Sequence, residues 1–181
     1  MAGLRANMIR ALGSAADIPA LAGVLRRAFG TVADTYGLTE MNAPTNPAFV
    51  TPEKLKEYLR KPVTVFGLFD SGTMIGCVAV EPSGKADGVY YVERLAVLPE
   101  HRHCGHGSAL LLHALAAISE GGGTCASIGI MNQNERLKQW YEARGFAETA
   151  RRTFAHLPFE VCFMSREIST PTAGVPPARP S

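Results

Sequence analysis

The residues best suited to chemistry lie between an apolar segment and an amphipathic one. The stretch Leu95-Ala-Val-Leu-Pro-Glu-His-Arg-His-Cys-Gly-His-Gly-Ser-Ala-Leu-Leu-Leu112 predicts a strand ending at Pro99, a tight loop with Gly105 and Gly107, and a helix from about Ser108. Glycines at such a turn let the backbone approach a ligand closely, and the new helix adds unpaired N–H groups and the positive end of its dipole. The loop is therefore a candidate site for a phosphate or pyrophosphate.

The spacing Arg102-x-x-Gly105-x-Gly107 narrows the kind of phosphate ligand. No Gly-Lys-Ser/Thr follows, so the segment is not a P-loop, and it lacks the third glycine of the dinucleotide-binding fingerprint. Taken alone, the motif also fits a glycine-rich turn that binds nothing.

Imidazoles and a thiol also cluster in this loop, at His101, His103, Cys104 and His106. Such groups ligate zinc. However, the backbone of a phosphate loop faces the anion and its side chains point outward, so these groups are not expected to converge on one ion with the carboxylates that orient ligating imidazoles. We therefore expect no metal.

A second motif follows one predicted strand later. The stretch Asn134-Glu-Arg-Leu-Lys-Gln-Trp-Tyr-Glu-Ala-Arg-Gly-Phe146 predicts an amphipathic helix with Asn134 as N-cap and Gly145 at its end. On its own, it also fits an ordinary helix that buries a Trp-Tyr pair.

Together, in this order, the two motifs resemble the signatures of the GCN5-related N-acetyltransferase (GNAT) family. One family signature is Gln/Arg-x-x-Gly-x-Gly/Ala after a strand carrying Leu-x-Val. The other is Asn-x-x-Ala-x-x-x-Tyr-x-x-x-Gly-Phe, and Leu137 stands here where alanine is common. The resemblance covers about residues 7–168 and implies acetyl-CoA as cosubstrate.

The resemblance also implies how the cosubstrate is held. Backbone N–H groups from His103 to Ser108 would bind the pyrophosphate, and the backbone of 95–97 would pair with the pantetheine arm as an added strand. A backbone N–H near Val97 would be the oxyanion donor. The expected cofactor-binding residues are Leu95, Ala96, Val97, Arg102, His103, Cys104, Gly105, His106, Gly107, Ser108, Asn134 and Tyr141.

Two residues are candidates for proton transfer. Tyr141 is the predicted general acid for the departing thiolate, with a core tyrosine as the alternative. In some family members, a glutamate acts as the general base at the position where this chain has Gly129. Glu93, a charged residue in an apolar strand, is the remaining carboxylate for the general base, and its alternative is a partner for Arg94.

The predicted function is acetyl transfer from acetyl-CoA to a primary amine, by direct attack in a ternary complex. A small-molecule amine is the favoured acceptor. A protein or peptide N-acetyltransferase and a catalytically silent CoA-binding sensor are the alternatives. Residues 30–50 and 153–160 would decide the acceptor, and they contain neither an acidic cluster nor an obvious basic trap for an acidic substrate.

The elements that must position these residues follow from hydrophobic periodicity and turn residues. A helix begins after Asp17 and is expected to stop at Gly30, and residues 31–50 are expected to form a loop. The almost wholly apolar stretch 89–98 is expected to be buried on both faces. Strands are predicted at about 7–12, 63–69, 74–80, 89–98, 125–131, 147–155 and 159–168, and further helices at about 52–61, 108–120 and 134–144.

This order predicts an α/β fold with a mixed, mostly antiparallel central sheet and helices on both faces, as in the GNAT family. The 181 residues suit a single domain, 1–168, followed by a proline-rich tail, 169–181, that is predicted to be disordered. A net charge of +2 gives no reason to expect nucleic acid or an anionic membrane as partner. Four scattered cysteines and no secretory apolar segment favour the cytoplasm. A homodimer is compatible with these patterns.

Overall fold

One sheet organises the protein, whose computed structural model describes residues 8–169. The sheet has seven strands in the order β1-β2-β3-β4-β5-β7-β6, and of these neighbours only β4 and β5 run parallel. The predicted mixed, mostly antiparallel sheet is confirmed. The strands are β1 (Met8–Ala11), β2 (Thr64–Asp70), β3 (Thr73–Pro82), β4 (Val89–Val97), β5 (Cys125–Met131), β6 (Ala147–Thr153) and β7 (Glu160–Glu167).

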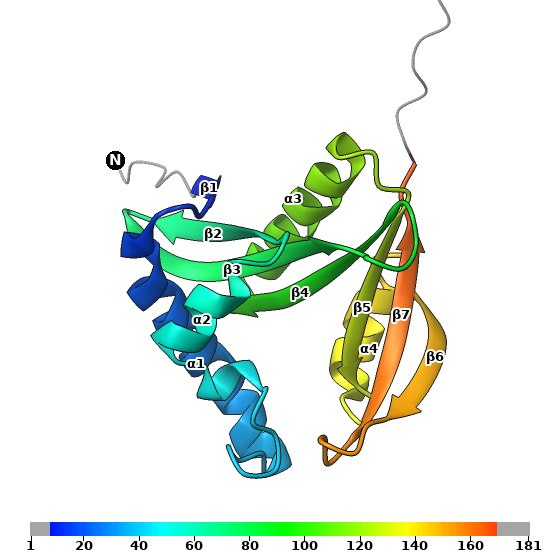
Figure 1. Ribbon diagram of the computed structural model, residues 1–181, viewed down its shortest axis with the longest axis horizontal. Coiled ribbons are helices and arrows are strands. Elements are labelled where there is room, and N and C mark those ends of the chain that lie inside the picture. The colour runs from blue at the N-terminus through cyan, green and yellow to red at the C-terminus, as the bar shows by residue number, and fades with distance from the viewer. Residues whose placement is uncertain (1–7, 170–181) are drawn as a thin grey trace, which may run out of the picture.

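Helices cover both faces of the sheet, as predicted. Helices α1 (Ile18–Tyr36) and α2 (Pro52–Tyr58) lie on one face of the β1–β4 half, and α3 (His106–Glu120) lies on the other (Figure 1). Helix α4 (Glu135–Glu142) packs beside β5. The core between these layers is aliphatic, with Leu21, Leu25 and Ile75 on one side and Leu110 and Ile118 on the other, all at most 2% exposed.

Helix α1 is longer than predicted, and the expected stop at Gly30 is wrong. The helix runs through Gly30 and ends at Gly37, whose positive φ of 63° is the left-handed conformation that closes a helix. A glycine inside a helix costs only about 1 kcal/mol. Burial of Ala33 and Leu38 beyond Gly30 offsets that cost. The predicted 31–50 loop is therefore helical at both ends, with a short 3-10 helix, η2, at Pro47–Phe49.

The expectation that β4 is buried on both faces is also wrong. Val92, Ala96 and Val97 are buried, whereas Glu93 is exposed. The cause is that β4 pairs with β5 only from Val89 to Tyr91, after which the two strands diverge (Figure 1). Residues 92–97 of β4 and 128–131 of β5 thus form the two sides of a V, which we call the β4–β5 opening.

A β-bulge interrupts β4 on its other side. The β3–β4 register passes from Cys77↔Ala96 to Ala79↔Glu93, so β4 carries one residue more than β3 over this stretch. Arg94, in the bulge, has a positive φ of 52°. The Cys77 thiol donates to the Arg94 carbonyl oxygen at 3.5 Å, and burial raises the pKa of that thiol to about 12. Cys77 therefore supports the bulge as a protonated thiol.

Parts of the predicted chain ends lie outside the described residues. Residue 7 of the predicted first strand and residues 170–181 of the predicted tail belong to these. Within residues 8–169, no helix has both the length and the apolar character needed to cross a bilayer.

Candidate active site

The loop before α3 offers a row of unused backbone donors. Helix α3 begins at His106, slightly earlier than predicted, and its N-cap Gly105 has φ 83° and no side-chain cap. His103 also has a positive φ, 62°. Alternating conformations of this kind turn successive N–H groups toward one point. In the described part of the chain, no acceptor meets the N–H groups of His103, Cys104, Gly105, Gly107 or Ser108.

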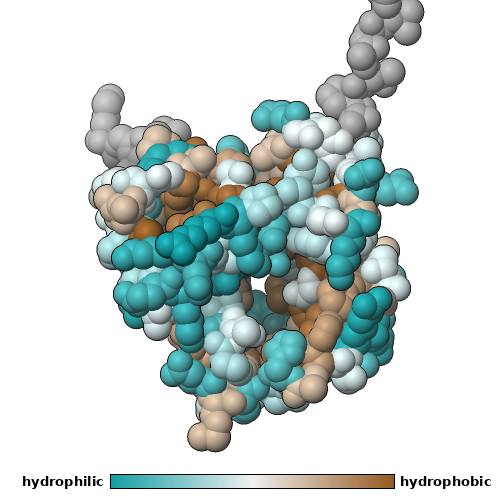
Figure 2. Space-filling model, viewed as in Figure 1, coloured by the Kyte–Doolittle hydropathy of each residue, from teal (hydrophilic) through white to brown (hydrophobic). Residues whose placement is uncertain are grey.

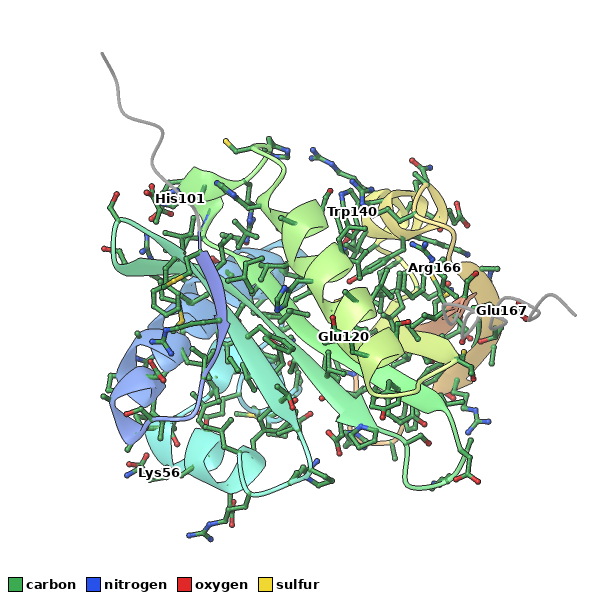
Figure 3. All side chains as sticks on the ribbon, turned by 90° about the horizontal axis from the view of Figure 1, so that it is seen from above. Lys56, His101, Glu120, Trp140, Arg166 and Glu167 are labelled. Atoms are coloured by element: carbon green, nitrogen blue, oxygen red, sulfur yellow. The ribbon has the colours of Figure 1, made fainter. Side chains whose placement is uncertain are left out.

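Helix α4 fixes the start of α3 from the side. Trp140 lies against the first turn of α3, where a Cβ on Gly107 would come within 3.6 Å of its ring (Figure 3). The Arg144 guanidinium stacks 3.7 Å from the Trp140 ring centroid and donates to the Ser108 hydroxyl oxygen at 2.7 Å. The positive charge of Arg144 therefore lies next to the N-terminus of α3. The arginine charge and the helix dipole both favour binding of an anion there.

The Arg102 side chain turns away from the loop and into the protein. Its Nε donates to the Val97 carbonyl at 3.1 Å, Nη1 to the Thr31 hydroxyl at 3.0 Å and Nη2 to the Ala28 carbonyl at 2.8 Å. All three nitrogens are thus engaged, and they tie α1 to the end of β4. The sequence motif predicted a cofactor-binding residue here, and the structure gives its side chain a supporting role.

The β4 edge that faces the opening has lost its strand partner. Backbone groups of successive residues in a strand point to opposite sides. Because β5 leaves after Tyr91, the groups of 92–97 that point away from β3 face the opening. Figure 2 shows this face hollowed between the two halves of the sheet, with apolar residues in its depth. The Leu98 N–H bonds to the Ile75 carbonyl on β3, so the alternation directs the backbone groups of Ala96 to β3 and those of Leu95 and Val97 to the opening. Pairing of this edge with an extended ligand stays a prediction.

Tyr141 lies on α4 and is only 5% exposed. Its ring packs edge-on against Trp140 and Phe146, at centroid distances of 4.9 and 5.4 Å. Among the described residues, the phenol has no hydrogen-bond partner. Burial raises the pKa of Tyr141, and the nearby Arg144 charge offsets only part of that rise. The phenol therefore keeps its proton at neutral pH.

Asn134 caps α4. Its side-chain oxygen accepts from the Leu137 N–H at 3.2 Å, which satisfies one of the free donors at the helix start. The predicted N-cap is confirmed. This contact gives Asn134 a structural role, and its predicted contact with the cosubstrate stays a prediction.

Glu93 and Arg94 both contact Tyr58, a residue that the motifs did not indicate. The Tyr58 hydroxyl donates to Glu93 Oε2 at 3.0 Å, and the Arg94 guanidinium lies 4.0 Å from the ring centroid. Burial first, and then the Glu93 charge, raise the pKa of Tyr58. The bulge explains the arrangement, because it lets two adjacent residues of β4 reach the same aromatic ring. No ion pair joins Glu93 to Arg94 among residues 8–169.

Two side chains near the opening keep buried polar atoms without a partner in the described part of the chain. These atoms are Arg94 Nε and Nη1, and Asn132 Oδ1. Arg94 lines a hollow with Asn46, Phe49 and Lys54. A second hollow lies between the segment that follows α1 and the β6–β7 turn, and is lined by Met41, Asn42, Pro44, Ala155, His156, Leu157 and Pro158. The segments predicted to select the acceptor thus border hollows.

The imidazoles of the loop do not gather around one point. The rings of His101 and His106 are 6.3 Å apart. Over residues 8–169, no three His, Cys, Asp or Glu side chains are placed to share a metal ion.

Comparison with known sequences gives a family match that includes both motifs, the loop before α3 and helix α4. Residues 35–146 match the model of the acetyltransferase (GNAT) family. The amino-acid acetyltransferase of Pseudomonas putida is 28% identical over 118 residues, which are 65% of this chain and 26% of that protein. The amino-acid acetyltransferase of Ectopseudomonas mendocina is 29% identical over 117 residues, with 64% and 26% covered. The chain thus spans about a quarter of the length of these curated relatives.

Solved structures show the same fold. The ribosomal-protein-S18-alanine N-acetyltransferase of Escherichia coli superposes with a TM-score of 0.71 at 19% identity, over 94% of this chain and 99% of that one. The PaiA N-acetyltransferase of Thermoplasma acidophilum, in complex with coenzyme A, gives a TM-score of 0.67 at 20% identity, over 90% and 99%. With the family model matching more than half of its residues, the chain belongs to the GNAT family of acetyltransferases.

Proposed function

We propose that the protein transfers an acetyl group from acetyl-CoA to a primary amine of a small molecule. One observation carries the proposal: unused backbone donors at the start of α3 lie next to the unpaired β4 edge of the β4–β5 opening. This combination fits a ligand with a pyrophosphate at one end and an amide-bearing arm at the other, and coenzyme A has both. GNAT acetyltransferases use acetyl-CoA, which adds to the support.

The residues that would hold acetyl-CoA follow from these contacts. Backbone N–H groups of His103 to Ser108 would bind the pyrophosphate, with Arg144 adding positive charge nearby. The open edge of 95–97, where the backbone groups of Leu95 and Val97 point away from β3, would pair with the pantetheine amides. A backbone N–H near Val97 would stabilise the developing oxyanion. Bound in this way, the cosubstrate supplies an activated acyl group in the form of a thioester.

Tyr141 is the proposed general acid. Its buried phenol is protonated and has no hydrogen-bond partner among the described residues, so its proton is free to pass to the departing sulfur. The same apolar surroundings would raise the proton affinity of a thiolate formed beside it. Transfer of that proton yields neutral thiol as the bond between carbonyl carbon and sulfur breaks.

Glu93 is the proposed acceptor of the amine proton, acting through water. Alkylammonium groups have a pKa of about 10, so a base must remove the proton before or during attack. The sequence argument for Glu93 rested on burial, and that premise is wrong, because Glu93 is exposed. What supports the role is its place in β4 beside the opening and the Tyr58 hydroxyl, which orients one carboxylate oxygen.

A small-molecule acceptor is supported by the hollows around the opening. The hollow lined by Arg94 has a volume of about 210 Å³, and the loop after α1 and the β6–β7 turn together border the second one. The curated relatives are named as amino-acid acetyltransferases, which makes free amino acids the first acceptors to test.

The test is release of free thiol from acetyl-CoA in the presence of amines, amino acids and short peptides. We expect amine-dependent release, matched by a gain of one acetyl group in the mass of the acceptor. Release with peptides alone would point to a protein or peptide acetyltransferase. Tight binding of acetyl-CoA without release, over the full panel, would mean that the chain is a CoA-binding module and would overturn the proposal.

A further inference from the structure

Arg94 combines three features that a purely structural arginine rarely shows together. It has a positive φ of 52°, in the left-handed region that costs a non-glycine residue about 1–2 kcal/mol. Its Nε and Nη1 are buried without a hydrogen-bond partner in the described part of the chain. Arg94 is also one of the residues that line a hollow with Asn46 and Lys54. Strained residues of this kind concentrate at functional sites.

The unpartnered nitrogens are the decisive feature. A guanidinium is charged at all relevant pH values, and its N–H groups cost free energy when they are removed from water without an acceptor. The ring of Tyr58, at 4.0 Å, covers one face of the guanidinium but accepts no hydrogen bond in its plane. In the described part of the chain, Nε and Nη1 of Arg94 are therefore left without an acceptor.

The neighbouring carboxylates do not satisfy Arg94. Glu93 accepts from the Tyr58 hydroxyl at 3.0 Å and makes no ion pair with Arg94. Glu40 lies 3.4 Å from Lys54, the second cation of the hollow, and both of those side chains are exposed. The hollow thus contains one arginine with no carboxylate partner among the described residues, and one lysine whose charge Glu40 partly offsets.

We propose that Arg94 binds a carboxylate of the acceptor, so that the substrate class is a primary amine carrying a carboxylate. Each edge of a guanidinium that grips a carboxylate with two hydrogen bonds includes Nε or Nη1, the unpartnered atoms of Arg94. The bulge places this anchor in the strand whose following residues, Leu95 to Val97, face the opening. Lys54 also lines the hollow, but its charge is more solvated and is partly offset by Glu40.

The inference rests on the proposed acetyl transfer and assigns the part of that site that selects the acceptor. Its turnover test compares matched pairs: the common amino acids, β-alanine and 4-aminobutyrate, each against its carboxamide at equal free-amine concentration. For the preferred pair, we expect kcat/KM to favour the carboxylate by about tenfold to a hundredfold, the value of a charge-assisted hydrogen bond. Arg94→Gln should abolish this preference, mainly through KM, so that carboxylate and carboxamide react with similar kcat/KM.

Matched variants separate recognition from general damage. Arg94→Lys keeps the charge without the planar fork and should retain part of the preference. Arg60→Gln removes an exposed arginine of the same region and should leave the preference intact. Equal rates for carboxylate and carboxamide in the wild type, or an undiminished preference in Arg94→Gln, would overturn the proposal.

A binding measurement keeps this test independent of turnover. With arginine labelled by ¹⁵N and coenzyme A present, the Nε–H resonance of Arg94 should shift on addition of the amino acids and stay in place with their carboxamides. If no amine is acetylated but this shift occurs, acetyl transfer fails while the carboxylate site stands. If the resonance responds to no carboxylate, the carboxylate site fails even where acetyl transfer succeeds.

Discussion

Tyr141 is the residue on which the proposed chemistry depends most. Replacing it with phenylalanine removes one hydroxyl and keeps the packing against Trp140 and Phe146. We expect Tyr141→Phe to lower kcat by about a hundredfold or more, the usual contribution of a general acid, and to leave the Kd for acetyl-CoA nearly unchanged. Tyr90→Phe, which removes a hydroxyl bonded to the Gly121 carbonyl, is the control. Equal losses in kcat and in binding would assign Tyr141 to the core.

Glu93 makes a separate prediction about pH. If its carboxylate accepts the amine proton, Glu93→Gln lowers kcat and removes the acidic limb of its pH profile, because the amide has no protonated form to disable. The Gln side chain can still accept from Tyr58, so the local structure should survive. Glu57→Gln, an exposed carboxylate on α2, is the control. An unchanged acidic limb would exclude Glu93 as the base.

At this scale, the sequence motifs predicted the backbone conformation of the loop better than they predicted the contacts of side chains. The loop around Gly105 was predictable because glycine and helix-start signals are local. The roles of Arg102 and Arg94 were not. Arg102 is in the motif but bonds to Ala28 and Thr31, more than 70 positions away. Arg94 gains its place from a bulge against Cys77, for which its neighbours in sequence carry no signal.

Helix α1 yields a prediction about two of its glycines. Gly30 lies inside the helix, where a Cβ meets no atom within 4 Å, so Gly30→Ala should raise the free energy of unfolding by about 0.5–1 kcal/mol. Gly37→Ala places a Cβ on a residue with φ 63° and should lower it by about 1–2 kcal/mol. Urea denaturation of both variants measures the difference. Destabilisation by Gly30→Ala would contradict a continuous α1.

Helix α3 has a glycine with positive φ at each end, and variants of the two separate an effect on binding from an effect on stability. Gly105 has φ 83° before the first turn, Gly122 has φ 78° after the last, and both lie in open space. Alanine at either position should cost about 1–2 kcal/mol of stability. Only Gly105→Ala should also weaken coenzyme A binding, by about tenfold, because it distorts the row of N–H donors. Equal affinity in the two variants would move the pyrophosphate away from this loop.

Element types were predictable because each depends on local periodicity and turn residues. Their limits depended on tertiary contacts. By sequence alone, Gly30 indicates the end of a helix. Ala33 and Leu38, however, are buried against the segment before η2, and this packing stabilises the helix beyond Gly30. The apolar β4 signalled burial on both faces, yet its pairing with β5 ends at Tyr91. In each case, long-range packing overrode a correct local preference.

The whole molecule is built around the β4–β5 opening. The β1–β4 half carries α1, α2 and α3, the other half carries α4, and the loop that leads into α3 lies at the end of β4 (Figure 1). Acetyl donor and acceptor would thus meet at a place where the sheet itself has parted. The sequence motifs implied the donor half of this site. The acceptor half required the folded arrangement of Tyr58, Glu93 and Arg94.

The central claim is that the opening and the loop before α3 together hold coenzyme A. Amide hydrogen exchange with and without coenzyme A, resolved by residue, tests it most directly. We predict that the ligand slows exchange at the N–H groups of 103–108 and on the open edge of 95–97, with little change in β1, β2 and β6, away from the opening. Protection confined to other segments, or none at saturating coenzyme A, would contradict the account.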